Sequence, residues 1–208
     1  MNALVFGRRQ QGKSTLAFAL AEEKQLPVAI YDINAQFRAW PEEVVSDPSD
    51  FALKIEDSDL VIYRPESDPW EEFEPVADAL WERDGYVLIV DEASQLQSPS
   101  AAHPKLDRLV RMCDAKTVHL IQTIHRPADA AVICRSLATD WYIFRTNQEN
   151  DLKVIAERCG ARVAQEAASI QPHEYVHWDD SAGIYTVCKR PDSWFRDIHD
   201  TRSIAANA

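Results

Sequence analysis

The sequence predicts an α/β fold, in which a mainly parallel β-sheet is flanked by helices and followed by a C-terminal β-hairpin. Three observations lead to this prediction. Short apolar runs of strand length alternate along the chain with longer segments of helical periodicity, as in a parallel sheet covered on both faces. The first apolar run is followed directly by a glycine-bounded loop and a helix. Near the C-terminus, two short β-prone segments flank a polar turn.

The first strand, residues 3–6, leads into the sequence GRRQQGKS, and a helix is predicted to follow at residues 15–21. This sequence matches the phosphate-binding loop GxxxxGK[ST] in the strand–loop–helix context that the pattern requires. Glycines let backbone N–H groups turn toward phosphate oxygens, and the helix adds the positive end of its dipole. The residues expected to bind the nucleotide are Gly7, Arg8, Arg9, Gln10, Gln11, Gly12, Lys13, Ser14 and Thr15.

Two of these loop residues have specific expected roles. The ammonium group of Lys13 should reach the β- and γ-phosphates, where it would also act in catalysis, and the hydroxyl of Ser14 should bind Mg²⁺. The expected cofactors are therefore ATP and Mg²⁺. A chance match to the pattern is the alternative, but a buried strand before it and a helix after it make that alternative a poor one.

The remaining elements follow from apolar runs, helical periodicity and turn residues. Strands are predicted at residues 27–32, 60–63, 86–90, 118–123 and 141–144. Helices are predicted at residues 50–56, 69–83, 105–113, 129–137, 150–158 and 162–170. The hairpin is predicted at residues 174–178 and 184–188. Residues 34–48 are polar and turn-rich, and the polar tail from Pro191 is expected to be loosely ordered.

The length of 208 residues suits a single domain, with a core at about residues 1–160 and a C-terminal helix, hairpin and tail at about 161–208. No apolar run approaches the ~20 residues of a membrane span, and the chain begins directly with a strand, so neither an anchor nor a signal peptide is expected. The 4 cysteines are dispersed and form no CxxC pair, which argues against a zinc site and a disulfide framework. A cytoplasmic location is therefore expected.

The net charge of −12 argues against broad attraction of nucleic acid by a monomer. Any contact with DNA should then be local. The densest basic stretch provides candidates for such a contact, although a plain solvated helix face is the simpler interpretation of it. Its members are Lys105, Arg108, Arg111 and Lys116.

A second element of the site is predicted where the apolar run at residues 86–90 ends in Asp91 and Glu92. An acid at the carboxyl end of a buried parallel strand lies at the edge where such sheets bind ligands. Asp91 should hold Mg²⁺, directly or through water, and Glu92 should polarise the water that attacks the γ-phosphate. The second acid favours hydrolysis over binding alone, because it provides a base.

A third element is the segment at residues 119–127, which leaves the next strand with polar side chains. A polar group there can detect whether the γ-phosphate is present. His125 is the first candidate for this role, with Thr123 and Gln122 as rivals and an exposed loop histidine as the alternative. A metal site at His119 and His125 is not expected, because no third ligand is near in sequence. His173 and His177 are expected at the surface of the hairpin.

Together these elements resemble the FtsK–HerA superfamily of DNA-pumping ATPases, over roughly residues 3–160. In that family the acids at the end of the Walker B strand correspond to Asp91 and Glu92 here. The next strand of the family runs into Gln-Arg-Pro, and the corresponding residues of this chain are His125, Arg126 and Pro127. The Asp32 strand and the segments at 143–147 and 151–155 also look like the family's. The resemblance implies a P-loop NTPase fold of the RecA/FtsK type. One departure from the family pattern is the histidine at position 125, where the family usually has glutamine.

A chain without membrane anchors or extra domains is most similar, within that superfamily, to the genome-packaging ATPases of viruses with an internal membrane. This resemblance implies a homo-oligomeric ring, a hexamer or pentamer, that threads double-stranded DNA. It further implies a capsid vertex as a partner, and the host cytoplasm or the packaging vertex of the virion as the location. An arginine from one subunit would complete the catalytic site of its neighbour, with Arg111, Arg126 and Arg145 as candidates.

Two other functions remain as alternatives. The chain could be an ATP-binding switch or scaffold that does not pump. It could also be a phosphotransferase of the nucleoside kinase type, because the segment that begins at Asp91 resembles the Asp-Glu-Ala-Gln of thymidine kinases. Those kinases carry a zinc-binding lasso with paired cysteines, which this sequence lacks.

Overall fold

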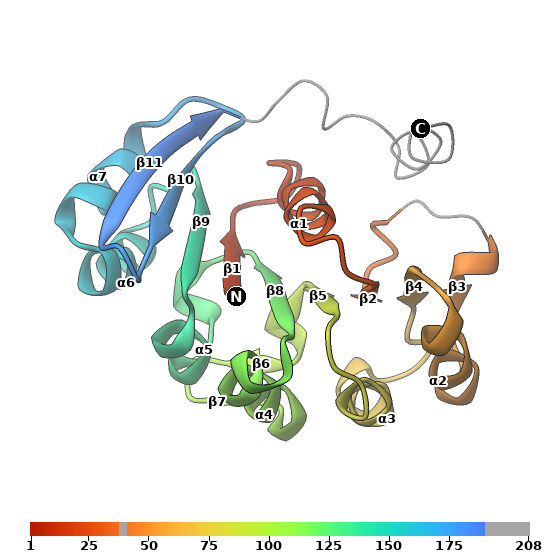
Figure 1. The fold of residues 1–208 in the computed structure, drawn as a ribbon. Coiled ribbons are helices and arrows are strands. Elements are labelled where there is room, and N and C mark those ends of the chain that lie inside the picture. Colours follow the sequence, from red (N-terminus) through yellow and green to blue (C-terminus); the bar gives the residue numbers. More distant parts are fainter. Residues whose placement is uncertain (38–40, 190–208) are drawn as a thin grey trace.

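A computed structural model describes residues 1–37 and 41–189, so the predicted tail from Pro191 lies outside the described residues. Nine strands form one sheet with the order β11-β10-β9-β1-β8-β5-β2-β4-β3 (Figure 1). The strands from β9 to β3 pair in parallel, whereas β10 and β11 pair antiparallel at one edge. These strands are β1 (Asn2–Phe6), β2 (Val28–Asp32), β3 (Val44–Val45), β4 (Leu60–Tyr63), β5 (Val87–Asp91), β8 (His119–Ile124), β9 (Asp140–Phe144), β10 (Glu174–Asp179) and β11 (Ile184–Lys189).

Helices cover both faces of the sheet, but unequally (Figure 1). Among the helices of residues 1–37 and 41–189, one face packs against α1 alone, and the other packs against the remaining helices. The helices are α1 (Lys13–Glu22), α2 (Pro48–Asp57), α3 (Pro69–Trp81), α4 (Pro104–Met112), α5 (Val132–Leu137), α6 (Glu149–Cys159) and α7 (Ala161–Ser169). The α/β fold with a mainly parallel sheet and a C-terminal hairpin is therefore confirmed.

The alternation of side chains along β1 shows why both faces need helices. Leu4 and Phe6 belong to the apolar cluster under α2–α7, whereas Ala3 and Val5 belong to the cluster under α1. All four are at most 1% exposed. Successive residues of a strand point to opposite faces, so an apolar run without polar alternation has to be buried on both sides. This places β1, and the loop that follows it, at the centre of the molecule.

Three of the helices on the face opposite α1 begin with the same kind of N-terminal cap. In each, a polar side chain accepts a hydrogen bond from the first turn, and proline occupies the first helical position, where no N–H is needed. The cap residues are Asp47 for α2, Asp68 for α3 and His103 for α4, with bonds of 2.7, 2.9 and 3.1 Å to the N–H groups of Ser49, Trp70 and Lys105.

The structure differs from the sequence prediction in several places. The helix predicted at residues 129–137 is divided, because Ala130 and Ala131 are extended and separate the 3₁₀ turn Pro127–Asp129 from α5. Residues 34–48, which were predicted to form polar turns, contain the 3₁₀ turn Pro41–Glu43 and the short strand β3. A small hairpin of β6 (Gln97–Ser98) and β7 (Ala101–Ala102) had no counterpart in the prediction. Short elements of this kind are too brief to show a periodicity.

The prediction that His177 lies at the surface of the hairpin is wrong. Its ring is half-buried and stacks on Tyr142 at 4.4 Å, and its Nε2 lies 2.9 Å from Oδ1 of Asp140. The reason is that β10 pairs with β9 as well as β11, which places His177 directly opposite Tyr142. His173 is exposed, as expected.

None of the helices in residues 1–37 and 41–189 combines the length and the apolar character that crossing a membrane would require. Of the cysteines, Cys113, Cys134 and Cys159 are buried and Cys188 is half-buried, and all of them are free thiols.

Candidate active site

The candidate site lies at the carboxyl edge of the sheet, where β1 ends between β8 and β9. The segment after β1 turns to α1 on one face, whereas β8 and β9 lead to helices on the other face. Such a change of direction leaves a crevice at the carboxyl ends of the strands. A cavity of about 450 Å³ opens there. It is lined by Arg9, Gln10, Gly12, Lys13, Ser14, Thr15, Asn34, Gln36, Asp91, Glu92 and His125.

The loop between β1 and α1 is held in shape by one of its own side chains. Oε1 of Gln11 accepts the backbone N–H of Arg8 at 2.6 Å, and its Nε2 donates to the carbonyl of Arg145 at 3.1 Å. Gly12, with φ 99°, has the left-handed conformation that glycine adopts without strain, and its carbonyl accepts the N–H of Leu16 at 2.9 Å. The side chain of Gln11 therefore orders the loop instead of lining the 450 Å³ cavity.

Gly7 sits in the tightest place of this loop, and its replacement by alanine is expected to abolish nucleotide binding. An added Cβ would lie 2.6 Å from Oε1 of Gln11 and 2.8 Å from Cβ of Phe144, and the second atom cannot rotate away. The loop would have to shift, at a cost of about 1–3 kcal/mol. Thermal unfolding and ATP titration of Gly7→Ala would measure both effects.

The matched control for that substitution is Gly183→Ala in the hairpin turn. This position has φ +65° and no atom within 4 Å of an added Cβ, so the substitution strains the backbone far from the loop. It should lower stability by about 1 kcal/mol and leave ATP affinity unchanged. Equal affinities for the two variants would contradict the role assigned to the Gly7 packing.

Lys13 begins α1 and is 8% exposed. Its Nζ lies 3.3 Å from the carbonyl oxygen of Arg8 and 3.3 Å from Nδ1 of His125. Burial lowers the pKa of Lys13, while the carboxylates of Glu92 and Asp91 act in the opposite direction. An anion in the cavity would restore a favourable environment to this buried ammonium group.

Asp91 ends β5 and is 2% exposed. Its Oδ1 accepts hydrogen bonds from the hydroxyls of Ser14 at 3.0 Å and Thr123 at 2.7 Å. Burial raises the pKa of Asp91, and the hydrogen bonds from Thr123 and Ser14, which act in the opposite direction, do not cancel this effect. No cationic side chain of the described residues forms an ion pair with it. A buried carboxylate with a hydroxyl beside it fits Mg²⁺, which prefers oxygen ligands.

The described residues contain no cluster of three or more histidine, cysteine, aspartate or glutamate side chains that could hold a metal ion alone. This agrees with the usual binding of Mg²⁺ in nucleotide sites, where one or two protein oxygens act together with substrate phosphates and waters. Ser14 and Asp91 are the two protein groups in position to hold it.

Glu92 is held in a strained conformation at the rim of the cavity. It has φ 55°, in the left-handed region that costs energy for residues other than glycine. Its N–H donates to Oγ1 of Thr123 at 3.0 Å, its Oε1 accepts from Ser94 at 2.8 Å, and its Oε2 lies 2.9 Å from Nε2 of His125. The side chain is 12% exposed, so the carboxylate is aimed but still accessible to a water molecule.

His125 connects Glu92 and Lys13. Its Nε2 lies 2.9 Å from Oε2 of Glu92, and its Nδ1 lies 3.3 Å from both Nζ of Lys13 and the carbonyl oxygen of Gly7. The two rival residues of β8 have other positions. The Gln122 side chain is buried on the opposite side, where it accepts from Gln97 at 2.9 Å, and Thr123 is bonded to Asp91. Of the three, only His125 lines the cavity.

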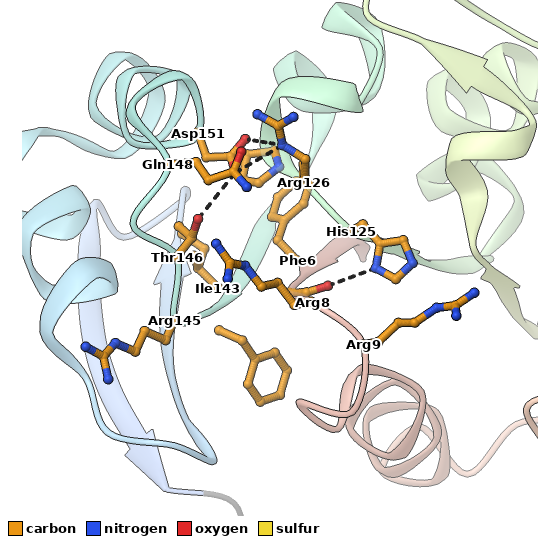
Figure 2. A pocket seen from close by; sticks show the side chains of 13 residues that line it. Phe6, Arg8, Arg9, His125, Arg126, Ile143, Arg145, Thr146, Gln148 and Asp151 are labelled. Atoms are coloured by element: carbon orange, nitrogen blue, oxygen red, sulfur yellow. Dashed lines mark hydrogen bonds and ion pairs between the residues drawn. The ribbon is translucent and has the colours of Figure 1, made fainter.

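A second cavity of about 320 Å³ lies on the other side of the loop, between the ends of β8 and β9 (Figure 2). Arg126 borders it and donates from Nε to Oδ1 of Asp151 at 3.3 Å, and Oδ2 of Asp151 accepts from the hydroxyl of Thr146 at 3.3 Å. In Figure 2 the guanidinium of Arg145 points away from His125. Neither arginine therefore reaches the 450 Å³ cavity of its own chain.

The third arginine candidate, Arg111, lies near the end of α4, which leads to the amino end of β8. It is therefore at the opposite edge of the sheet, and it pairs with Asp107 at 3.0 Å. The rest of the basic stretch is also engaged within the chain. Lys105 binds Asp78 at 2.6 Å, Arg108 stacks over Trp81 at 3.5 Å, and Lys116 lies 3.4 Å from Asp84.

Sequence reasoning missed Asn34 and Gln36, which line the cavity from the segment after β2. Asp32 positions this segment, because its carboxylate accepts the N–H of Gln36 at 2.7 Å and of Phe37 at 3.3 Å. Arg64 neutralises that buried carboxylate at 3.0 Å. The sequence shows that Asp32 follows a buried strand, but it does not show which residues Asp32 binds, because these lie in a loop without periodicity.

No protein-family model and no curated protein matches the sequence. Solved structures do match. The genome packaging NTPase B204 from Sulfolobus turreted icosahedral virus 2, in complex with AMPPCP, has a TM-score of 0.77 and 19% sequence identity, with 91% of this chain and 97% of that chain covered. B204, the DNA-packaging ATPase from Sulfolobus turreted icosahedral virus, has a TM-score of 0.72 and 20% identity, with 92% and 100% covered.

VirB4 of Thermoanaerobacter pseudethanolicus is a third match, with a TM-score of 0.70, 12% identity, and 94% of this chain and 91% of that chain covered. At these identities the likeness concerns the fold. The α/β fold that the resemblance implies is shared with these solved structures.

Proposed function

We propose that this chain binds ATP and Mg²⁺ in the 450 Å³ cavity, hydrolyses the ATP, and works as a homo-oligomeric ring that moves double-stranded DNA, as in viral genome packaging. The observation that carries the hydrolytic part is the convergence of four groups on one cavity. They are the ammonium of Lys13, the hydroxyl of Ser14, and the carboxylates of Asp91 and Glu92.

Each group has a role that its environment supports. Lys13 binds the β- and γ-phosphates, because its buried ammonium group lacks an ion pair among the described residues. Ser14 and Asp91 would hold Mg²⁺, which would neutralise phosphate charge. Glu92 takes a proton from the attacking water as the water oxygen forms a bond to the γ-phosphorus. The bond from that phosphorus to the bridging oxygen breaks, and ADP leaves with its electron pair.

A second hollow next to the loop could hold the nucleobase. Gln10 lines the main cavity and also a hollow of about 170 Å³ that is bordered by Arg145, Pro172 and His173. A nucleotide with its phosphates against Lys13 can therefore place its base along Gln10 in this hollow. Glu92 does not line this hollow, so a base bound there would leave the attacking water free.

The motor part of the proposal is supported by the fold. The two packaging proteins named above match over nearly their whole length. The acidic balance of the chain is compatible with this function, because a ring repeats a few weak phosphate contacts around one DNA molecule. Lys105, Arg108, Arg111 and Lys116 would have to exchange partners in their own chain for DNA phosphates.

The proposal is tested by the ATPase rate with and without long double-stranded DNA, together with the assembly state by mass photometry. We expect turnover that DNA raises several-fold, in an assembly of several copies, and no turnover for Lys13→Ala. Transfer of phosphate to a nucleoside would favour the kinase alternative. Tight binding of ATP without turnover would favour the switch, and turnover unaffected by DNA would remove the motor part.

A further inference from the structure

We propose that Arg9, inside the phosphate loop, provides in cis the arginine that stabilises the γ-phosphoryl group during hydrolysis. A site would then not depend on a neighbouring subunit for this charge. This inference rests on the proposed ATPase function and adds a catalytic residue to it. It also differs from the expectation that Arg111, Arg126 or Arg145 acts across a subunit interface.

The position of Arg9 is the first argument. It lines the 450 Å³ cavity together with Lys13, Asp91 and Glu92, and none of the other described arginines does so. In Figure 2 its side chain extends beside His125, whose ring contacts both Glu92 and Lys13. The charge of Arg9 already acts on this site, because it contributes to the lowered pKa of Lys13. A group that repels the phosphate-binding lysine gains a partner when an anion enters.

Arg9 also lacks a side-chain partner among the described residues, unlike its neighbours. Its guanidinium forms no hydrogen bond or ion pair with any side chain in residues 1–37 and 41–189. By contrast, Arg8 donates to Asn147 at 3.0 Å, and Arg126 donates to Asp151 at 3.3 Å. The chain has 34 acidic and 22 basic side chains, so a partner for an exposed arginine is easy to supply.

The acid that Arg9 could have used is occupied. Both carboxylate oxygens of Glu92 have partners. Oε1 accepts a hydrogen bond from the hydroxyl of Ser94 at 2.8 Å, and Oε2 lies 2.9 Å from Nε2 of His125. Arg9 is therefore left available for an oxygen ligand that enters the cavity. Glu92 is in turn kept from forming an ion pair with Arg9 that would block both groups.

A guanidinium suits this task for a chemical reason. In phosphoryl transfer, negative charge spreads over the γ-oxygens and the bridging oxygen as the bond breaks. A planar fork of N–H donors can contact two of these oxygens at once, which an ammonium group cannot do in the same geometry. An arginine used in this way is worth about 10³–10⁵ in rate in related enzymes. Arg9 is exposed and long enough to adjust to that geometry.

The first experiment compares the wild-type chain with Arg9→Ala, Arg9→Lys and the control Arg162→Ala. Arg162 is an exposed cation on α7 that lines none of the three cavities around the loop. We expect Arg9→Ala to lower kcat at least ~100-fold while ADP affinity changes less than about fivefold. Binding of ADP with aluminium fluoride, a mimic of the transferred phosphoryl group, should be lost. Arg9→Lys should recover only part of the rate, and Arg162→Ala should match the wild-type chain.

The second experiment separates cis from trans action by mixing Arg9→Ala chains with Lys13→Ala chains. If Arg9 serves its own site, the mixture stays inactive, because neither chain has a complete site. If Arg9 reaches into a neighbour, mixed assemblies recover a substantial fraction of wild-type turnover, and the cis assignment is overturned. Full activity of Arg9→Ala alone would also overturn it. A wild-type chain without ATPase activity would instead refute the proposed function itself.

Discussion

Replacing Glu92 with glutamine is expected to preserve ATP binding and to lower hydrolysis by about 10²–10⁴, the usual contribution of a positioned general base. Glutamine has the same shape, so its side chain can still contact Ser94 and His125, which hold Glu92 at 2.8 and 2.9 Å. It cannot accept the proton of the attacking water. The variant should therefore retain ATP in its uncleaved form.

Single-turnover hydrolysis and ATP titration measure the two halves of that prediction. Ser94→Ala is the matched control, because it removes one contact of the Glu92 carboxylate and keeps the base. We expect that control to lose less than about tenfold in rate. Loss of ATP binding in Glu92→Gln would show that Glu92 supports the loop structurally. Unchanged turnover would show that another group accepts the proton.

Replacing Asp91 with asparagine is expected to act in opposite directions on stability and on function. The carboxylate is 2% exposed and has no cationic partner among the described residues, and burial raises its pKa. The amide oxygen of asparagine can still accept from Ser14 and Thr123, which lie 3.0 and 2.7 Å from the present Oδ1. Removing a charge that is costly to bury should stabilise the ligand-free chain by roughly 1 kcal/mol, or about 2–4 °C in Tm.

The same substitution removes the anionic ligand for Mg²⁺. We expect Mg²⁺ to lose its effect on ATP affinity, and turnover to fall at least ~100-fold. Thermal unfolding with and without Mg²⁺ and ATP measures the stability of the chain and the effect of Mg²⁺ on ATP binding, and an ATPase assay measures turnover. A lower Tm for the ligand-free variant would contradict the electrostatic interpretation of Asp91. An unchanged response to Mg²⁺ would show that the metal binds elsewhere.

The fold and the loop could be predicted from sequence because their signals are local. An apolar run, two glycines, a lysine and a helix appear in order at the N-terminus, and Asp91 follows directly from a buried strand. That Asp91 lies near Ser14 could also be predicted, because the carboxyl ends of parallel strands share one edge of the sheet. The hydrogen bond of 3.0 Å between them agrees with that expectation.

The contacts around Glu92 could not be predicted, because they depend on the order of the strands. His125 reaches Glu92 only because β8 lies between β1 and β5 in the sheet. For the same reason the sequence could not show which arginine faces the cavity. Arg111, Arg126 and Arg145 were chosen by their sequence context, whereas Arg9 attracted attention only as a member of the loop.

The central claim is that the loop after β1 holds a nucleoside triphosphate whose Mg²⁺ is bound by Ser14 and Asp91. Calorimetric titration of ATP into the 208-residue chain, with and without Mg²⁺, tests it most directly. The account predicts one ATP per chain, with affinity that rises at least tenfold with Mg²⁺ in the wild-type chain and does not rise in Asp91→Asn. Absence of binding by a folded wild-type chain, or equal binding by Lys13→Ala, would contradict it.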